Sequence, residues 1–302
     1  MTINIAITGA SGFCGSAILE KCQNAQHNIL SLQRRADQNP SVRSVHFDLA
    51  GAVELNSESL RNIDVVVHAA AVAHNKGKNK TEIFKLNEEA TKILFDKCLE
   101  AGVKKFIFFS TVGVYGKNSF NRAISLSDSE NPVSRYAHSK YNCEQYLLDH
   151  SKMGLIEVSI LRLPLTYGRN APGKFGLLSK LAKTSLPLPF SGAENTRSMI
   201  AVDTVANLVL QICEGKLPAR GIELVADARP YSTRELIESI RIKEGAPRKL
   251  FYVTKPLMKF ALTAVGHAAA YEQLYEDLEF ESTIDVNATG CVDANTAPAD
   301  YT

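Results

Sequence analysis

The chain begins with a β-type apolar run, Ile3–Thr8, that leads directly into glycines spaced by two intervening residues. Gly9 permits a tight turn, and Gly12 lets the backbone approach a pyrophosphate. Gly15 allows a helix expected over Phe13–Cys22 to pack closely on the strand, and the helix N-terminus offers N–H groups to an anion. Glycines after a strand can also mean only a tight turn. Their position and spacing nevertheless predict the first βαβ unit of a dinucleotide-binding domain.

The length and composition are those of a globular protein without an unusual charge. The 302 residues allow a large core, and contents of 45% hydrophobic and 22% charged residues are ordinary. A formal net charge of +2 favours neither nucleic acid nor an anionic membrane as the main partner. Six cysteines occur without a C-x-x-C pair or a histidine at ligand spacing, so we expect reduced thiols, no metal site and a cytoplasmic protein.

Membrane segments are not expected. The first apolar run closes at a glycine after six residues, which is not the pattern of a signal peptide. The longest candidate for membrane contact, Pro256–Ala270, is interrupted by Lys259 and His267 and is too short to span a bilayer. We interpret it as an amphipathic helix of a smaller lobe rather than as a membrane-surface segment.

Short apolar strands alternate with helical patterns through the first half of the chain. The strand expected at Phe106–Phe109 has no polar interruption, as in a sheet covered on both faces. Helices are expected over Thr81–Ala101, which Gly102 ends, and over Tyr136–Lys152. This alternation predicts an α/β fold with a doubly wound parallel sheet. Further strands are expected at Asn28–Gln33, Val45–Phe47, Asp64–His68, Val158–Leu163 and Ile222–Val225.

Regularity declines after Tyr167 and Gly168, where loops containing Pro and Gly begin. We therefore predict a dinucleotide-binding domain over residues 1–168 and a smaller, mostly substrate-binding lobe over residues 169–302. The segment 200–226 is expected to return to the first domain. A long polar loop is expected at Lys117–Ser134. Later helices are expected at Phe175–Lys183, Val202–Glu214, Thr233–Lys243 and Lys255–Val265.

The candidate catalytic residues lie at the end of one expected strand and on the helix that comes next in the sequence. Ser110 and Thr111 stand at the carboxyl end of a strand, where open α/β sheets bind ligands. Tyr136 and Lys140 are one helical turn apart on one face. A phenol titrates near pH 10, and a neighbouring ammonium favours the phenolate, so we expect Lys140 to lower the pKa of Tyr136. A Tyr-x-x-x-Lys pair alone is common, but with the glycine loop and Thr111 it predicts hydride transfer with a nicotinamide.

These motifs, in this order, resemble the extended short-chain dehydrogenases/reductases of the NAD-dependent epimerase/dehydratase superfamily over nearly the whole chain. The resemblance implies that Thr111, Tyr136 and Lys140 are catalytic. It also implies a homodimer formed through the helices Thr81–Ala101 and Tyr136–Lys152. The expected cofactor-binding residues are Gly9, Ser11, Gly12, Phe13, Gly15, Arg34, Arg35, Asp48, Leu49, Ala69, Ala70, Ala71, Lys140 and Leu163.

The resemblance also implies a set of substrate-binding residues, with Arg197 on a diphosphate, for which a bidentate guanidinium is suited. Surface or structural roles are the alternatives for several of them. The expected substrate-binding residues are His74, Asn87, Arg162, Phe175 and Arg197.

Two local features narrow the reaction class. Sugar-nucleotide 4,6-dehydratases that resemble this chain carry acidic residues directly after the catalytic Thr, whereas Val112 and Gly113 stand here. Dehydration is therefore disfavoured. Members that use NAD usually place an Asp at the end of the second strand, but this chain has Gln33, Arg34 and Arg35. A guanidinium there can accept a 2′-phosphate, so NADP(H) is favoured and NAD(H) is the alternative.

The segments Ala171–Phe175, Leu186–Pro189 and Arg197–Ser198 are similar to bacterial 4-ketoreductases. Those enzymes act on UDP-4-keto-6-deoxy-N-acetylhexosamines in surface polysaccharide biosynthesis, so we expect the same reaction on a nucleotide-sugar substrate. The nearest alternative is a UDP-hexose 4-epimerase with tightly bound NAD. The alternative of another class is a non-catalytic dinucleotide-binding regulator, although such regulators typically lose the Tyr or the Lys that this chain keeps.

Overall fold

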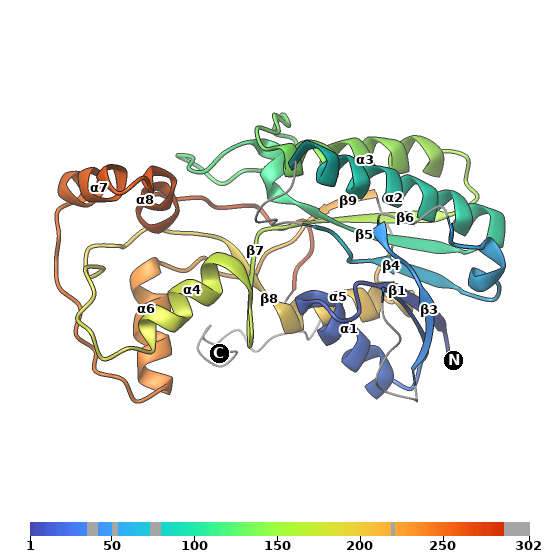
Figure 1. Ribbon diagram of the computed structural model, residues 1–302, viewed down its shortest axis with the longest axis horizontal. Helices are drawn as coiled ribbons and strands as arrows, with labels where there is room; N and C mark the ends of the chain where they lie inside the picture. Colours follow the sequence, from blue (N-terminus) through green and yellow to red (C-terminus); the bar gives the residue numbers. More distant parts are fainter. Residues whose placement is uncertain (35–41, 50–53, 73–79, 219–220, 287–302) are drawn as a thin grey trace. The chain divides into compact units, whose positions relative to one another are not determined.

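The computed structural model describes residues 1–34, 42–49, 54–72, 80–218 and 221–286 (Figure 1). A seven-stranded sheet has the strand order β3-β2-β1-β4-β5-β6-β9. The pairs β1–β2, β1–β4, β2–β3 and β4–β5 are parallel, and the β1–β4 register aligns Thr8 with His68. The strands are β1 Asn4–Thr8, β2 Asn28–Gln33, β3 Arg43–His46, β4 Val65–His68, β5 Lys105–Thr111, β6 Glu157–Leu163 and β9 Gly221–Leu224.

Helices cover both faces of this sheet, with α2 and α3 on one face and α1 and α5 on the other (Figure 1). The core between them includes Phe95, Phe106 and Leu147, none of which has exposed surface. Burial on both faces explains why β4 and β5 are almost continuous apolar runs. The predicted doubly wound α/β sheet is confirmed. The helices are α1 Phe13–Asn24, α2 Lys80–Ala101, α3 Arg135–Ser151 and α5 Val202–Cys213.

The chain divides into two compact units. The first comprises residues 1–116, 129–162 and 205–223, and the second comprises residues 117–128, 163–204 and those from Leu224 onward. The loop 117–128 and residues 163–168 therefore pack in the second unit, whereas the sequence analysis assigns them to the first domain. The segment that returns to the first unit, 205–223, lies within the expected range 200–226.

The second unit combines a two-stranded parallel sheet with short helices. Its core gathers Tyr167, Phe175, Phe190, Ile237 and Tyr275. The sequence analysis did not predict β7, β8 or α8, because elements of three to eight residues carry too little periodicity to be recognised. The elements of this unit are β7 Leu165–Tyr167, α4 Gly173–Ala182, β8 Met199–Ala201, α6 Thr233–Lys243, α7 Lys255–Ala264 and α8 Ala268–Tyr275.

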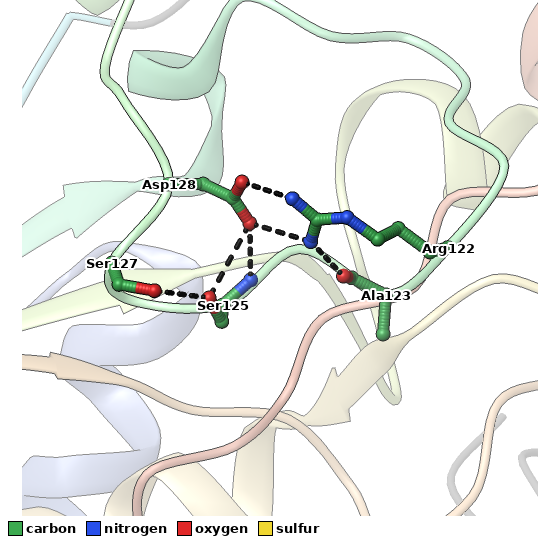
Figure 2. Close-up of polar contacts among 5 residues, drawn as sticks. All are labelled: Arg122, Ala123, Ser125, Ser127 and Asp128. Atoms are coloured by element: carbon green, nitrogen blue, oxygen red, sulfur yellow. Dashed lines mark hydrogen bonds and ion pairs between the residues drawn. The ribbon is translucent and has the colours of Figure 1, made fainter.

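The first half of the expected polar loop Lys117–Ser134 is held by charge-assisted hydrogen bonds. Arg122 donates to both carboxylate oxygens of Asp128, and also to the carbonyl oxygen of Ala123 at 2.8 Å (Figure 2). The same carboxylate accepts the backbone N–H of Ser125 at 2.8 Å. A stretch whose composition predicts only a loop thus contains a local network of charge-assisted hydrogen bonds.

No helix in the described ranges is long and apolar enough to cross a membrane. The described cysteines, Cys14, Cys22, Cys98, Cys143 and Cys213, are free thiols, and Cys291 lies outside the described residues. Within the same part of the chain, no cluster of His, Cys, Asp and Glu side chains could hold a metal ion.

Candidate active site

The three glycines between β1 and α1 meet different backbone constraints. Gly9 has a φ of +70°, a conformation that residues with a Cβ rarely adopt. A Cβ on Gly15 would lie 2.0 Å from the carbonyl oxygen of Gly9, so only glycine lets α1 start this close to the strand. Gly12 begins α1 without a side-chain cap, and its N–H donates to Gly9 O at 2.8 Å. The N–H groups in the first turn of α1 can therefore bind an anion.

A groove of about 260 Å³ opens beside this loop. Its walls come from the ends of β1, β2 and β4 and from the turn after β3, the edge at which parallel sheets bind ligands. Phe13 and Gly15 lie in the first turn of α1, and Leu163 is the last residue of β6 and is not part of the wall. The expected cofactor-binding residues that the structure gathers in the wall are Gly9, Ser11, Gly12, Arg34, Asp48, Leu49, Ala69, Ala70 and Ala71.

The chemistry of this groove fits one half of a dinucleotide. Leu32, Phe47 and Leu49 give it apolar walls that suit a flat base. Asp48 adds a carboxylate, which accepts hydrogen bonds from amino or hydroxyl groups. The exposed Arg34 follows β2 and brings a guanidinium to the same wall. Arg35, the other arginine expected there, lies outside the described residues.

Thr111 ends β5 and caps a short 3-10 turn, η3 Val112–Tyr115. Its Oγ1 accepts the N–H of Gly113 at 3.1 Å, which leaves the hydroxyl proton available for another acceptor. A Cβ on Gly113 would lie 3.7 Å from the Cβ of Ala137, so η3 lies against the first turn of α3. The strand end and the helix that carries the Tyr–Lys pair therefore meet in the first unit.

The side chains of Tyr136 and Lys140 project from the first two turns of α3, whose N-terminus is capped by Ser134. Tyr136 is half-buried, and the thiol of Cys14 in α1 is near enough to raise the pKa of its phenol. Lys140 is buried, with its Nζ 4.4 Å from the ring centroid of Phe108 and 5.9 Å from that of Tyr136. The pair thus lies between the start of α1 and the sheet.

The protonation states of this pair differ from the expectation. Burial, with smaller contributions from the neighbouring Cys14 and Cys143, raises the pKa of Tyr136 to about 12. Burial also lowers the pKa of Lys140 to about 8. The prediction that Lys140 lowers the pKa of Tyr136 is wrong for this structure, because the loss of hydration on burial outweighs the attraction of the ammonium, which lies 5.9 Å from the ring centroid. Tyr136 is therefore a protonated phenol at neutral pH.

Arg162, expected to bind substrate, is instead the centre of a buried ion-pair network. It has no exposed surface, and its guanidinium donates to Glu144 at 2.7 and 3.2 Å. It also donates to Glu130 at 2.7 Å and to the hydroxyl of Tyr115 at 2.8 Å. Ser110 donates to the same Glu144 carboxylate. A side chain without exposed surface cannot touch a ligand, so the expected substrate contact is replaced by a role in joining β5, η3, α3 and β6.

Asn87, also expected to bind substrate, is buried and forms hydrogen bonds with the backbone. Its amide is almost fully buried, accepts the N–H of Val72 at 2.9 Å and donates to the carbonyl of Val72 at 3.1 Å. Val72 lines the groove. Asn87 therefore fixes the wall after β4, and with 3% of its surface exposed it offers little area for contact with a sugar nucleotide.

The sequence analysis missed His68, which supports the same wall. Thr91 donates its hydroxyl proton to a backbone carbonyl at 2.8 Å, so it accepts from His68 Nε2 at 3.0 Å. His68 Nδ1 then accepts from Thr8 Oγ1 at 2.7 Å, and Thr8 accepts the N–H of Ala70 at 3.1 Å. Complete burial lowers the pKa of His68 to about 3, with Lys140 adding to the effect, so the ring is neutral. A histidine at the end of an apolar strand is the only signal that the sequence offers.

The second unit contains the other expected substrate residues. Phe175 is buried in its core, with its ring centroid 5.8 Å from that of Tyr167, so it packs rather than binds a ligand. Arg197 is half-buried, and its Nη1 donates to the carbonyls of Asn118, Glu272 and Glu276 at 3.1, 3.3 and 2.9 Å. Burial lowers the pKa of Arg197 to about 10. His74 lies outside the described residues.

Comparison with known proteins identifies a family and several relatives to which this chain is similar. Residues 5–223 match the model of the NAD dependent epimerase/dehydratase family. The chain is 27% identical over 255 residues to a UDP-glucose 4-epimerase of Vibrio cholerae, covering 82% of this chain and 77% of the relative.

Solved structures share the fold over the whole chain. The UDP-N-acetylglucosamine 4-epimerase from Bacillus cereus matches with a TM-score of 0.77 at 19% identity, covering 99% of this chain and 96% of that one. The Bordetella bronchiseptica enzyme WbmH, solved in complex with NAD+, matches with a TM-score of 0.76 at 17% identity, covering 100% and 96%.

Proposed function

Because this chain belongs to the NAD dependent epimerase/dehydratase family, we propose that it is an oxidoreductase that uses a nicotinamide dinucleotide at C4 of a nucleotide sugar. One observation carries the proposal. Tyr136 is a protonated phenol one helical turn from the buried Lys140, and it neighbours Cys14 at the start of the glycine-loop helix. A proton donor and a dinucleotide groove in one unit are the two parts that carbonyl reduction requires.

The groove residues would hold the dinucleotide, which supplies or accepts the hydride when it is bound. The glycine loop and the first turn of α1 bind the pyrophosphate through backbone N–H groups. Asp48 and Leu49 bind the adenosine half, together with the alanines after β4. Arg34 follows β2 and presents a guanidinium, for which a 2′-phosphate is the matching anion. We therefore propose NADP(H) ahead of NAD(H), with Arg35 as the second ligand of that phosphate.

The chain's own groups provide acid–base chemistry at C4. Tyr136 donates its proton to the carbonyl oxygen as negative charge develops there, and takes a proton back in the reverse direction. Thr111, whose hydroxyl proton is not used by Gly113, donates a hydrogen bond to the same oxygen. Lys140 binds the cofactor ribose and keeps a cation near the phenol. Val112 and Gly113 provide no acid or base, so elimination of water is not part of the proposal.

We favour 4-ketoreduction of a UDP-4-keto-6-deoxy-N-acetylhexosamine, a step in surface polysaccharide biosynthesis. A protonated Tyr136 suits proton donation, and Arg34 suits NADP(H), which a reductase exchanges at each turnover. The second candidate is 4-epimerisation of a UDP-hexose with bound NAD. Its support is the likeness to the Vibrio cholerae UDP-glucose 4-epimerase over 82% of this chain, and the NAD+ bound by WbmH.

Other parts of the proposal concern the second unit and the assembly. Nη2 and Nε of Arg197 have no hydrogen-bond partner among the described residues, so they are the proposed donors to the substrate diphosphate. We propose that the second unit binds the sugar nucleotide. A homodimer through α2 and α3 and a cytoplasmic location complete the proposal.

A substrate and cofactor panel tests the function directly. UDP-4-keto-6-deoxy-N-acetylhexosamine and UDP-glucose are each incubated with NADPH or NADH, and absorbance of the reduced nicotinamide is followed. Oxidation of NADPH by the keto sugar supports reduction. Interconversion of UDP-glucose and UDP-galactose without net loss of reduced cofactor supports epimerisation. Failure of the protein to turn over any nucleotide sugar contradicts both candidates.

Tyr136→Phe tests the proton donor. Loss of a positioned acid–base group is expected to lower turnover by about 10²–10⁴-fold. Tyr141→Phe, on another side of the same helix, is the matched control and is expected to keep turnover. Equal turnover of both variants would remove Tyr136 from the mechanism.

A further inference from the structure

The segment Ala246–Tyr271, which contains α7, carries charged side chains of positive sign only. It holds Arg248, Lys249, Lys255 and Lys259 and no Asp or Glu over its whole length, in a chain whose formal net charge is only +2. All four side chains are exposed, and none forms an ion pair with a described residue. The segment therefore carries four exposed cations that form no ion pair within the described part of the chain.

The same segment exposes its large apolar side chains. On α7 only Met258 is buried, whereas Leu257 is 57% exposed and Phe260 72% exposed. Tyr252 before the helix and Val265 after it are 68% and 66% exposed. Leu257 and Phe260 are three residues apart and share one helix face. The expected amphipathic helix is present, but most of its apolar residues face outward instead of packing in the lobe.

An apolar hollow adjoins this helix in the second unit. It measures about 390 Å³ and is lined by Leu177 and Leu181 of α4 and by Ala270 and Leu274 of α8, among others. Leu177 is itself 70% exposed. The lining also includes Gly266 and His267, two and three residues after the end of α7, so the hollow begins close to the C-terminus of this helix.

In contrast to the interpretation from the sequence alone, we propose that this α7 surface, defined as segment 246–271 with the adjoining hollow, docks on an anionic phospholipid membrane. Exposed aromatic and aliphatic residues together with lysines and no acidic residue are the composition of helices that lie in the plane of a membrane interface. Lipid headgroups of negative charge complement the four cations. A second copy of this chain on the same surface would bring two like-charged segments together, which disfavours that occupant.

Vesicle flotation with the full chain tests the proposal. Vesicles of phosphatidylcholine alone are compared with vesicles that contain phosphatidylglycerol, at low and high salt. We expect binding only to the anionic vesicles and weaker binding at high salt. Leu257→Ser and Phe260→Ser are each expected to weaken binding about tenfold, and Lys255→Gln and Lys259→Gln about fivefold each.

Val133→Ser is the matched control, because Val133 is 72% exposed in the first unit. It is expected to bind vesicles like the wild type. Thermal unfolding checks that each variant is folded, and the salt dependence of the wild type tests the surface without any substitution. The proposal is overturned if the wild type does not bind anionic vesicles. It is also overturned if the four α7 variants bind these vesicles as strongly as the wild type does. It is also overturned if the wild type is a dimer in the absence of lipid and Phe260→Ser is a monomer.

Discussion

Replacing Arg162 by Met separates its two possible roles. The side chain has no exposed surface, and its loss removes two hydrogen bonds and the ion pair to the equally buried Glu144 carboxylate. Breaking a buried ion pair from one side costs about 3–5 kcal/mol, because an uncompensated charge stays in a medium of low polarity. A change of that size lowers the equilibrium constant for folding by a factor of at least about 10². Arg162→Met is therefore expected to unfold at clearly lower urea concentration.

Urea unfolding followed by circular dichroism measures the decrease in unfolding free energy. Two further variants serve as controls. Arg122→Met makes the same replacement in the exposed pair with Asp128 and is expected to change stability little. The double variant Arg162→Met/Glu144→Met removes both buried charges and is expected to regain much of the loss. If Arg162→Met keeps wild-type stability and only raises KM for the nucleotide sugar, the network assignment is refuted and Arg162 is a substrate ligand.

Three further perturbations test the groove and its support. Gly15→Ala puts a Cβ 2.0 Å from the carbonyl oxygen of Gly9, so dinucleotide affinity measured by fluorescence titration should fall at least about tenfold, whereas Ser16→Ala should not change it. For His68, the folded pKa of about 3 lies below the ordinary 6.5, so the unfolded chain binds the extra proton and stability falls with decreasing pH between these values. His68 is expected to contribute about 1.4 kcal/mol per pH unit to the pH dependence of the unfolding free energy measured in urea, and His68→Asn should reduce the slope by about that amount. A variant with the wild-type slope would contradict the neutral buried ring. Asn87→Ala removes both hydrogen bonds to the groove wall, so KM for the dinucleotide should rise while KM for the sugar nucleotide stays near wild type; the reverse pattern would restore Asn87 as a substrate ligand.

Sequence patterns identified the elements with strong local signals. The strand Asn28–Gln33 and the helix Thr233–Lys243 have the predicted bounds. A short, mostly apolar run between polar residues marks the strand, and a capping box and a basic last turn mark the helix, all within a few residues. The pairing of a glycine loop with a helix N-terminus is equally local. By contrast, β7 and β8 are three residues each and are fixed by pairing with each other across the chain. Their sequences contain nothing that specifies that partner.

In the candidate site, too, some features were predictable from local sequence and others depended on long-range packing. The types and order of Thr111, Tyr136 and Lys140, and the spacing of the glycines, were sufficient to predict the family, because these are constraints between near neighbours on a strand end or a helix turn. Whether a polar side chain contacts a ligand or a buried protein residue depends on which other segments of the chain pack next to it in the fold. Arg162 forms an ion pair with Glu144, and Asn87 forms hydrogen bonds with Val72. Burial raised the pKa of Tyr136, whereas the position of Lys140 in the sequence predicted a lowered pKa. Desolvation and distant partners are properties of the packed chain, so only the tertiary structure decided those roles.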